Sequence, residues 1–372
     1  MGEVGNGISR EGAQLERLQA LRFIAAAAIV VRHIFMELDQ HGIAYEMRDA
    51  FAAVPWGAGV DVFFVISGFV ITFGAVAKEP SARASGNFIV RRLIRLWPTY
   101  ALFTVLMLVA MVFVPDVLEH PTIDPAHTAA SFAFIPWPEP GDGHYYPVLG
   151  QGWTLNYEMF FYVCFAATMF APPRYRAALL WTGGIALVVA GLMWRLPAPL
   201  HFYADPIIIE FLFGVALAVL FRRWSFRSSW AIWAAPVGLA ALYVSDLIWP
   251  DVHRAVKAGI PGAAIVAGVV FSGPAVERYV GAAPLATLGN ASYALYLSHT
   301  FAVNLLLAVW LRLGLEAPWV FVGAAFVASV VVSLLVYVIL EKPTLKYLKD
   351  RHGRMRNARR RAPGASATAP AP

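Results

Sequence analysis

Residues 21–35 read LRFIAAAAIVVRHIF, an apolar run that carries Arg22, Arg32 and His33. A membrane-spanning helix needs about 20 mostly apolar residues, so the run and its flanks predict a first membrane helix over residues 18–37. The preceding residues 1–17 are polar and are expected to form a cytoplasmic segment. No convincing small-residue cleavage site follows the run, so we interpret it as a retained helix and not as a signal peptide.

The same apolar character continues through the rest of the chain. Of its 372 residues, 59% are hydrophobic and 14% are charged, against about 25% charged residues in a typical soluble domain. This composition excludes a disordered protein and an ordinary soluble enzyme, and the single cysteine excludes an internal disulfide. We predict an all-α, polytopic membrane protein with about ten membrane helices, at residues 18–37, 56–77, 97–115, 154–172, 177–195, 206–222, 230–249, 256–273, 290–311 and 318–340.

The distribution of Lys and Arg gives an orientation, because cytoplasmic loops of membrane proteins are enriched in these residues. With ten spans and a cytoplasmic N-terminus, 22 of them fall in inside segments and five in outside loops. We therefore predict that both termini are cytoplasmic, with a membrane domain over residues 18–342. The tail, residues 343–372, is basic and is expected to contact anionic lipid, not nucleic acid; its last residues, 362–372, are expected to be disordered.

Ionisable side chains inside a span are candidates for function, since a charge is costly to bury in a membrane. Arg22 and His33 are eleven residues apart, about 20° more than three helical turns, so they share one helix face roughly 16 Å apart. Asp61 and Glu158 lie near the outer ends of two other spans, at the predicted depth of His33. An imidazole with two carboxylates suits general base catalysis, whereas the alternatives are an interfacial histidine, a snorkelling arginine and, for Asp61, a helix cap.

Three further features are open to more than one interpretation. Arg92 and Arg95 lie three residues apart in the cytoplasmic stretch RRLIRLWPTY, which fits phosphate binding and equally fits a topological signal. His299 lies near the middle of the ninth span and is a candidate relay, a substrate contact or a partner of a neighbouring carbonyl. The outside loop at 116–152 has no Lys or Arg, is rich in proline and contains Tyr145 and Tyr146; this proline density opposes regular helix and, in a long ordered loop, favours function.

Six motifs together resemble the membrane-bound acyltransferase 3 family, over roughly residues 15–345. The motifs are LQALRFIAAAAIVVRH, GVDVFFVISGFVI, RRLIRLWPTY, GWTLNYEMFFY, YALYLSH and LEKP. The family's Arg-and-His pair falls on Arg22 and His33, and its paired arginines fall on Arg92 and Arg95. Its Trp/Glu motif, in a form similar to the exopolysaccharide-modifying members, falls on Trp153 and Glu158. One departure is Arg32, which precedes His33 where an aromatic or apolar residue is usual.

The resemblance implies an O-acyltransferase that moves an acyl group, commonly acetyl, from cytoplasmic acyl-CoA to a hydroxyl group, without a metal. His33, Glu158 and Asp61 would be the catalytic residues, and Arg22, Arg92 and Arg95 would bind acyl-CoA. The residues expected to contact the acceptor are Trp153, Tyr157, His299 and Tyr145. The acceptor would be an exopolysaccharide or a lipid-linked sugar.

Two other functions fit the same spans. One is an acyltransferase for a small natural product such as a macrolide, and the other is a saccharide transporter or flippase. For the acyltransferase we expect a multi-pass protein of the bacterial inner membrane whose partners are the saccharide acceptor, membrane lipid and polysaccharide assembly proteins.

Overall fold

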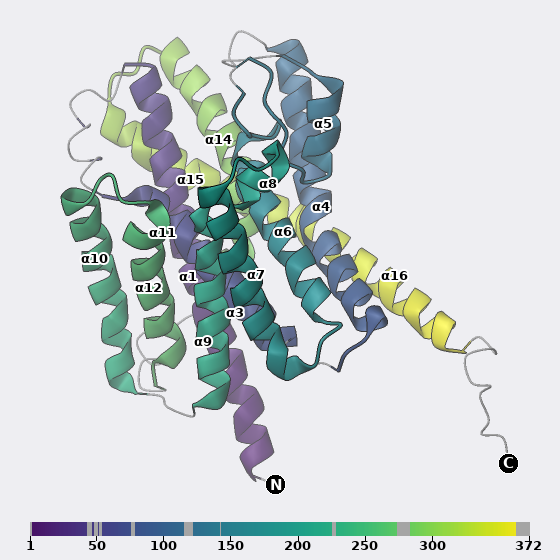
Figure 1. The fold of residues 1–372 in the computed structure, drawn as a ribbon. Coiled ribbons are helices and arrows are strands. Elements are labelled where there is room, and N and C mark those ends of the chain that lie inside the picture. The colour runs from purple at the N-terminus through teal and green to yellow at the C-terminus, as the bar shows by residue number, and fades with distance from the viewer. Residues whose placement is uncertain are drawn as a thin grey trace, which may run out of the picture.

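The structure, a computed structural model, describes residues 2–42, 47, 51, 54–75, 79–114, 122–141, 143–224, 228–273 and 283–361. Over these residues the chain is a bundle of helices without a β-strand (Figure 1), which confirms the all-α class. The longer helices are α1 (Gly2–Gln40), α3 (Gly59–Ala75), α4 (Ala82–Phe113), α6 (Trp153–Thr168), α7 (Pro173–Met193), α9 (Ile209–Arg223), α10 (Ala234–Ile248), α12 (Gly259–Phe271), α14 (Ser292–Arg312), α15 (Pro318–Val336) and α16 (Lys342–Arg361). The shorter segments are η2 (Trp56–Ala58), α5 (Pro125–Phe132), η4 (Gly150–Gly152), α8 (Ala198–Tyr203), η5 (Pro206–Ile208), η6 (Ser229–Trp233), α11 (Arg254–Lys257), α13 (Ala283–Asn290) and the π-helical turn η8 (Tyr337–Glu341).

Seven helical segments in the described part of the chain are long and apolar enough to cross a membrane. They coincide with seven of the ten predicted spans and are Trp56–Ala75, Ala82–Phe113, Pro173–Met193, Ser229–Ile248, Arg254–Phe271, Ser292–Arg312 and Pro318–Met355. The other three predicted spans lie on α1, α6 and α9. Apolar side chains along α7, α10 and α15 remain exposed, Leu247 by 71%, as expected for helices that face lipid. The chain is therefore a multi-pass membrane protein, and the number of crossings stays a prediction.

Two segments are more helical than the sequence predicts. α4 is one continuous helix that contains both the arginine motif, predicted to be cytoplasmic, and the third predicted span. Ser81 caps its first turn by accepting a hydrogen bond from the Ala84 N–H, and Pro98 lies inside it. The proline-rich loop that is predicted to lie outside likewise contains the two-turn helix α5, which starts at Pro125 after the cap residue Asp124. Proline is tolerated in the first turn of a helix, where its missing N–H has no partner to lose.

The helix α3 lies between α1 and α9 and touches both through glycines. A Cβ on Gly59 would collide with the carbonyl oxygen of Ala25 on α1. On the other side, a Cβ on Gly68 would collide with the Phe211 carbonyl of α9, and one on Gly214 with the Val65 carbonyl of α3. Small residues that let helix backbones approach closely are typical of membrane helix interfaces. These contacts fix α3, which carries several of the candidate site residues.

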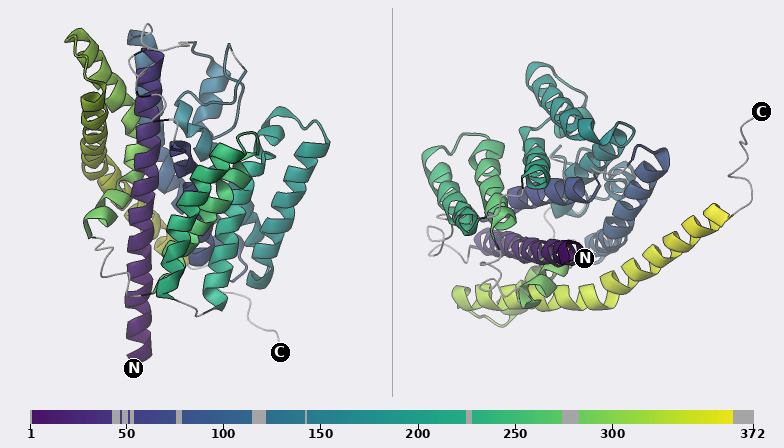
Figure 2. Two further views of the ribbon diagram at one scale, coloured as in Figure 1. Left: turned by 90° about the vertical axis from the view of Figure 1, so that its left-hand side faces the viewer. Right: turned by 90° about the horizontal axis from the view of Figure 1, so that it is seen from below.

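The two ends of the chain leave the bundle. The N-terminal part of α1 projects beyond the other helices, and α16 runs obliquely away from them (Figure 2). α16 contains the basic residues of the predicted tail, in helical form up to Arg361. The predicted disorder of residues 362–372 lies outside the described residues.

Candidate active site

Two histidines from distant parts of the chain meet between α1 and α14. The Nδ1 atom of His33 lies 2.6 Å from the Nε2 atom of His299, and the two rings are nearly coplanar, with an interplanar angle of 4°. The His299 side chain is fully buried, and its Nδ1 atom lies 3.0 Å from the carbonyl oxygen of Leu295 one turn earlier. His299 was expected to be a substrate contact, a relay or a carbonyl partner; the structure places it against His33 and against that carbonyl.

These contacts assign the protons of both neutral rings, because a neutral imidazole has one N–H donor and one acceptor nitrogen. A carbonyl oxygen only accepts, so Nδ1 of His299 carries a hydrogen and its Nε2 is the acceptor. Nδ1 of His33 must then donate to that Nε2. The remaining nitrogen, Nε2 of His33, has a free lone pair and is able to take a proton. The pair thus has the orientation of a base held by a second residue.

His33 faces a cavity of about 700 Å³ at the end of α1 that is predicted to be the outer end. Besides apolar and backbone groups, its walls carry the charged residues Arg32, Asp61, Asp246, Arg254 and Lys257. Trp153, Gln151 and Tyr296 form another part of the wall. Gln151 donates to the Leu297 carbonyl and to the Thr300 hydroxyl, at 3.2 Å each. The start of α6 is therefore bonded to the part of α14 that presents His299.

A second, smaller pocket of about 60 Å³ lies toward the other end of α1 and contains Arg22 and Arg95. Glu158 and Ser67 also line it, and the Ser67 hydroxyl donates to Glu158 at 3.2 Å. Tyr162 donates a short hydrogen bond to the same carboxylate. The structure thus places Glu158 with the predicted CoA-binding arginines and not at the depth of His33.

Arg92 lies outside the lining of this smaller pocket. Its guanidinium group stacks over the rings of Phe88 and Tyr162, each at 5.3 Å. Arg92 therefore contacts Tyr162, which donates to Glu158, whereas Arg95 lines the pocket directly.

The two cavities share a wall. Ile29, Val60 and Tyr296 line both of them, and His33 lies one turn beyond Ile29 on the same face of α1. The hydroxyl of Tyr296 is 2.8 Å from the Thr154 hydroxyl and donates to the Gln151 carbonyl at 2.7 Å, which fixes this ring in place. The arginines and the histidine pair therefore lie on opposite sides of a thin layer of side chains.

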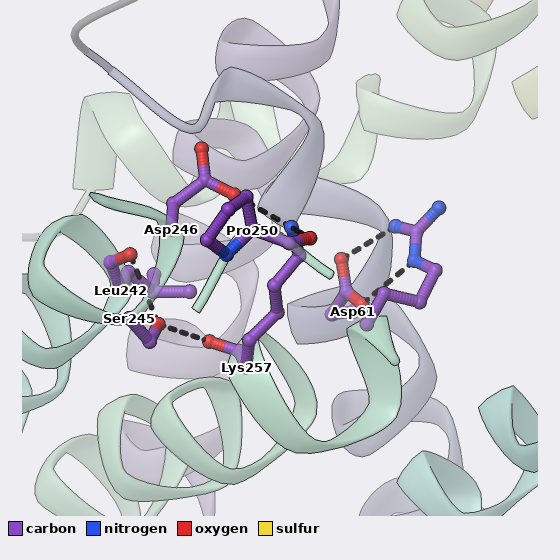
Figure 3. Close-up of polar contacts among 7 residues, drawn as sticks. Asp61, Leu242, Ser245, Asp246, Pro250 and Lys257 are labelled. Carbon is purple, nitrogen blue, oxygen red and sulfur yellow. Dashed lines mark hydrogen bonds and ion pairs between the residues drawn. The ribbon is translucent and has the colours of Figure 1, made fainter. Parts of the chain in front are cut away.

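Asp61 has a partner that the sequence did not indicate. It is fully buried and accepts two hydrogen bonds from Arg254, at 3.1 Å from Nε and 2.7 Å from Nη2 (Figure 3). Glu210 of α9 is also fully buried and interacts electrostatically with both residues. Asp61 shares the large cavity with His33, but its carboxylate is bonded to the guanidinium group. No spacing rule connects residues 61 and 254, so the sequence could not reveal this ion pair.

A third cavity of about 440 Å³ adjoins the large one and is mainly aromatic. Tyr145, Trp153, Tyr157 and Phe202 contribute to its lining, together with Asp205 and Arg254. Phe202 stacks on Tyr157 at 4.3 Å between ring centroids, and the Tyr157 hydroxyl donates to the Phe202 carbonyl at 2.7 Å. Trp153, Tyr146 and Arg254 line both this cavity and the large one. Three of the four residues expected to bind the acceptor therefore surround one continuous region.

Glu341 is a further candidate for the site. It is buried in the π-helical turn η8 and interacts electrostatically with Arg95 and Arg22. Such turns are frequent at functional sites. The only signal in the sequence was the LEKP motif, which does not show which arginines the carboxylate faces.

Comparisons with known proteins identify the family of the chain. The model of the family described as "Acyltransferase domain" (Acyl_transf_3) matches residues 15–338. The exopolysaccharide production protein ExoZ of Rhizobium meliloti is 32% identical over 78% of this chain and 89% of its own. Acyltransferase MdmB of Streptomyces mycarofaciens is 24% identical over 91% of this chain and 93% of its own. The putative membrane-bound transacylase BcsY of Komagataeibacter xylinus is 26% identical over 78% and 76%.

No solved structure gives a significant match to the chain. The family match covers most of the chain, and it includes the helices that carry the histidine pair and the arginine pocket. The chain therefore belongs to the acyltransferase 3 family and is a membrane-embedded O-acyltransferase.

Proposed function

We propose that this enzyme transfers an acetyl group from cytoplasmic acetyl-CoA to a hydroxyl of a saccharide at the outer side of a bacterial inner membrane. The observation that carries the proposal is the position of the His33–His299 pair, next to the wall between the arginine pocket and the large cavity. The donor and the acceptor would approach this wall from opposite sides. The relative named as an exopolysaccharide production protein favours a saccharide over a small natural product as acceptor.

The smaller pocket supports the assignment of the donor. Coenzyme A is a polyanion, so its phosphates would stay at the cytoplasmic side near Arg95 and Arg22. The two guanidinium groups would donate charge-assisted hydrogen bonds to the phosphates. The smaller pocket that these arginines line has a volume of about 60 Å³, which is room for only a few groups of the size of water. This volume favours a short acyl group such as acetyl. Glu158 would orient the two arginines or the thioester.

The two outer cavities support the assignment of the acceptor. Trp153, Tyr145 and Tyr157 present rings with an apolar face and a polar edge, which suits a ligand that has both kinds of surface. The cavities adjoin at Trp153, so a saccharide of more than one residue would extend from the third cavity toward His33.

The reaction follows from the proton positions. Nε2 of His33 takes the proton of the acceptor hydroxyl, and the oxygen attacks the carbonyl carbon of the thioester. The tetrahedral intermediate then expels the CoA thiolate, and His33 returns the proton to that sulfur. The products are the acetyl ester and CoA–SH, and His33 is regenerated. His299 holds the ring of His33 and accepts its Nδ1–H throughout.

The test uses inverted membrane vesicles that contain the full-length protein, its native polysaccharide precursor and radiolabelled acetyl-CoA. We expect label in the saccharide fraction with the wild type and a loss of about 10²- to 10⁴-fold with His33→Ala, since a general base contributes this much to a rate. His41→Ala is the matched control, because His41 is an exposed histidine that follows the same helix. Transfer within tenfold of wild type by His33→Ala, or label absent from saccharide with the wild type, contradicts the proposal. Label retained on the protein when the acceptor is omitted would indicate an acyl-histidine intermediate and not direct transfer.

A further inference from the structure

Arg32 occupies an unusual position beside the catalytic histidine. It is exposed to the large cavity and lines it next to His33. In the part of the chain that the structure describes, Arg32 has no hydrogen-bond or ion-pair partner. Its Nη1 atom lies 3.0 Å from the position that a Cβ on Gly57 would occupy. The guanidinium group therefore lies along the cavity wall at η2.

A second guanidinium group reaches the same glycine. Nη2 of Arg254 lies 3.5 Å from the Gly57 carbonyl oxygen, and Nε and Nη2 donate to Asp61. Among the described residues, Nη1 of Arg254 has no partner, so this N–H group remains available in the cavity. Arg32 and Arg254 thus both reach Gly57 with donor groups.

The charges on the cavity wall do not cancel. Lys257 is paired with Asp246 at 2.9 Å and also donates to the Pro250 carbonyl at 2.8 Å (Figure 3). Arg254 is paired with Asp61. Of the five charged residues that line the cavity, these four form two ion pairs, and Arg32 is left as the unpaired cation.

From this geometry we propose that the acceptor is an anionic saccharide, whose carboxylate or phosphate binds Arg32 and the free N–H of Arg254 close to the hydroxyl that is acylated. The inference rests on the proposed function, since it names the chemical class of that acceptor. An anion here satisfies a guanidinium group that has no hydrogen-bond or ion-pair partner among the described residues, and arginine matches the geometry of both carboxylate and phosphate.

The bound anion would also assist the reaction. His33 becomes an imidazolium when it takes the proton of the hydroxyl, and the adjacent Arg32 repels that charge. A carboxylate or phosphate on Arg32 offsets the repulsion. An anionic acceptor is therefore expected to have a lower KM and a higher kcat than a neutral acceptor of the same size.

The experiment compares two probes, cellobiose and cellobiouronic acid, with purified full-length protein in neutral-lipid nanodiscs. Isothermal titration gives their affinities without turnover, and labelled acetyl-CoA gives their rates. We expect the uronate to bind about 10- to 150-fold more tightly than cellobiose, the range for one charge-assisted contact. Arg32→Gln should remove most of this difference, since only the Arg254 contact remains, and leave the affinity for cellobiose unchanged, while Arg32→Lys should keep more of it. Arg195→Gln, a change at an exposed arginine outside the cavity lining, is the control and should behave as wild type.

Three results would overturn the inference. In the first, the wild type binds both probes equally, and in the second, Arg32→Gln retains the full preference for the uronate. In the third, nanodiscs that contain phosphatidylglycerol change the rate in a manner that requires Arg32, whatever the charge of the sugar; the anion is then a lipid headgroup. Failure of the proposed function is distinguishable, because it abolishes acetyl transfer to every acceptor while the titration still reports the charge preference.

Discussion

At the scale of single residues, the site depends on a hydrogen bond between two imidazoles that come from the two ends of the chain. His33 and His299 are 266 positions apart. In the proposed mechanism their contact defines which nitrogen is the base, so the second histidine would act through the first as a positioning residue. This gives His299 a role that can be separated from binding of either substrate.

The first prediction concerns that role. His299→Leu removes the acceptor of the His33 Nδ1–H, and the freed ring loses its alignment with the acceptor hydroxyl. We expect kcat to fall about 10²-fold, the usual effect of a misplacement of 1 Å, while both KM values change little. His299→Gln retains an acceptor oxygen and should recover part of kcat. Steady-state kinetics of the purified variants is the measurement, and a change confined to KM would indicate a substrate contact instead.

The second prediction separates the two arginines of the RRLIRLWPTY motif. Arg95 lines the smaller pocket, whereas Arg92 stacks on Phe88 and Tyr162. Arg95→Ala should raise the KM for acetyl-CoA about 10- to 150-fold, the value of one lost charge-assisted contact. Arg95→Lys should restore it in part, because lysine lacks the planar fork. Arg92→Ala should have the smaller effect on this KM; equal effects would mean that both groups touch the donor.

At the scale of the elements, the position of α3 determines which cavity each of its polar side chains lines. It carries Asp61 toward the large cavity and Ser67 toward the smaller pocket, six residues or about 9 Å apart along the helix. Its glycines hold it against α1 and α9. A side chain added at these contacts must push two backbones apart and so displace both ends of the site.

The third prediction follows from these contacts. Gly68→Ala places a methyl group against the Phe211 carbonyl and should destabilise the protein by about 1–3 kcal/mol, as overpacking does. Gly74→Ala is a matched control on the same helix, since nothing lies within 4 Å of a Cβ at that position. Gly74→Ala should change the free energy of unfolding by no more than about 1 kcal/mol, and the change should be stabilising because alanine favours the helix over glycine. Thermal unfolding in detergent compares the two, and equal Tm values would refute the glycine contact.

The elements also show which parts of the site a sequence can predict. The periodicity of α1 placed Arg22 and His33 on one face, and the structure has both facing cavities. The depth of Glu158 was predicted from the start of an apolar run, as if that start marked the membrane boundary. In fact α6 begins within the bundle, because Gln151 before it is buried. Glu158 therefore reaches the smaller pocket. The ion pair of Asp61 with Arg254 depends on tertiary packing alone.

At the scale of the whole molecule, the arrangement implies two entrances and one reaction centre. The arginine pocket and the large cavity occupy different ends of α1. In the predicted orientation, these ends face the cytoplasm and the outside. Neither substrate then needs to cross the membrane, which distinguishes the enzyme from the transporter that composition alone allowed.

The fourth prediction tests this orientation. Single cysteines in a Cys164→Ser background at Ala82, Ala126 and Met355, all exposed positions, can be labelled with a membrane-impermeant maleimide. We expect labelling at position 126 in intact cells, and at positions 82 and 355 only after permeabilisation. Labelling at position 82 in intact cells would reverse or break the ten-span topology, and with it the assignment of the donor side.

The shared wall of Ile29, Val60 and Tyr296 has a consequence beyond catalysis. In the predicted orientation these side chains separate two cavities that face opposite sides of the membrane, and the two sides differ in electrical potential. A bacterium that stores energy as a proton gradient across this membrane cannot tolerate a continuous file of water through the enzyme. In the proposed mechanism the packing of the wall must therefore let the acyl group meet a hydroxyl while it excludes hydronium and sodium ions. The enzyme would then be under a bioenergetic constraint that a soluble acyltransferase never meets.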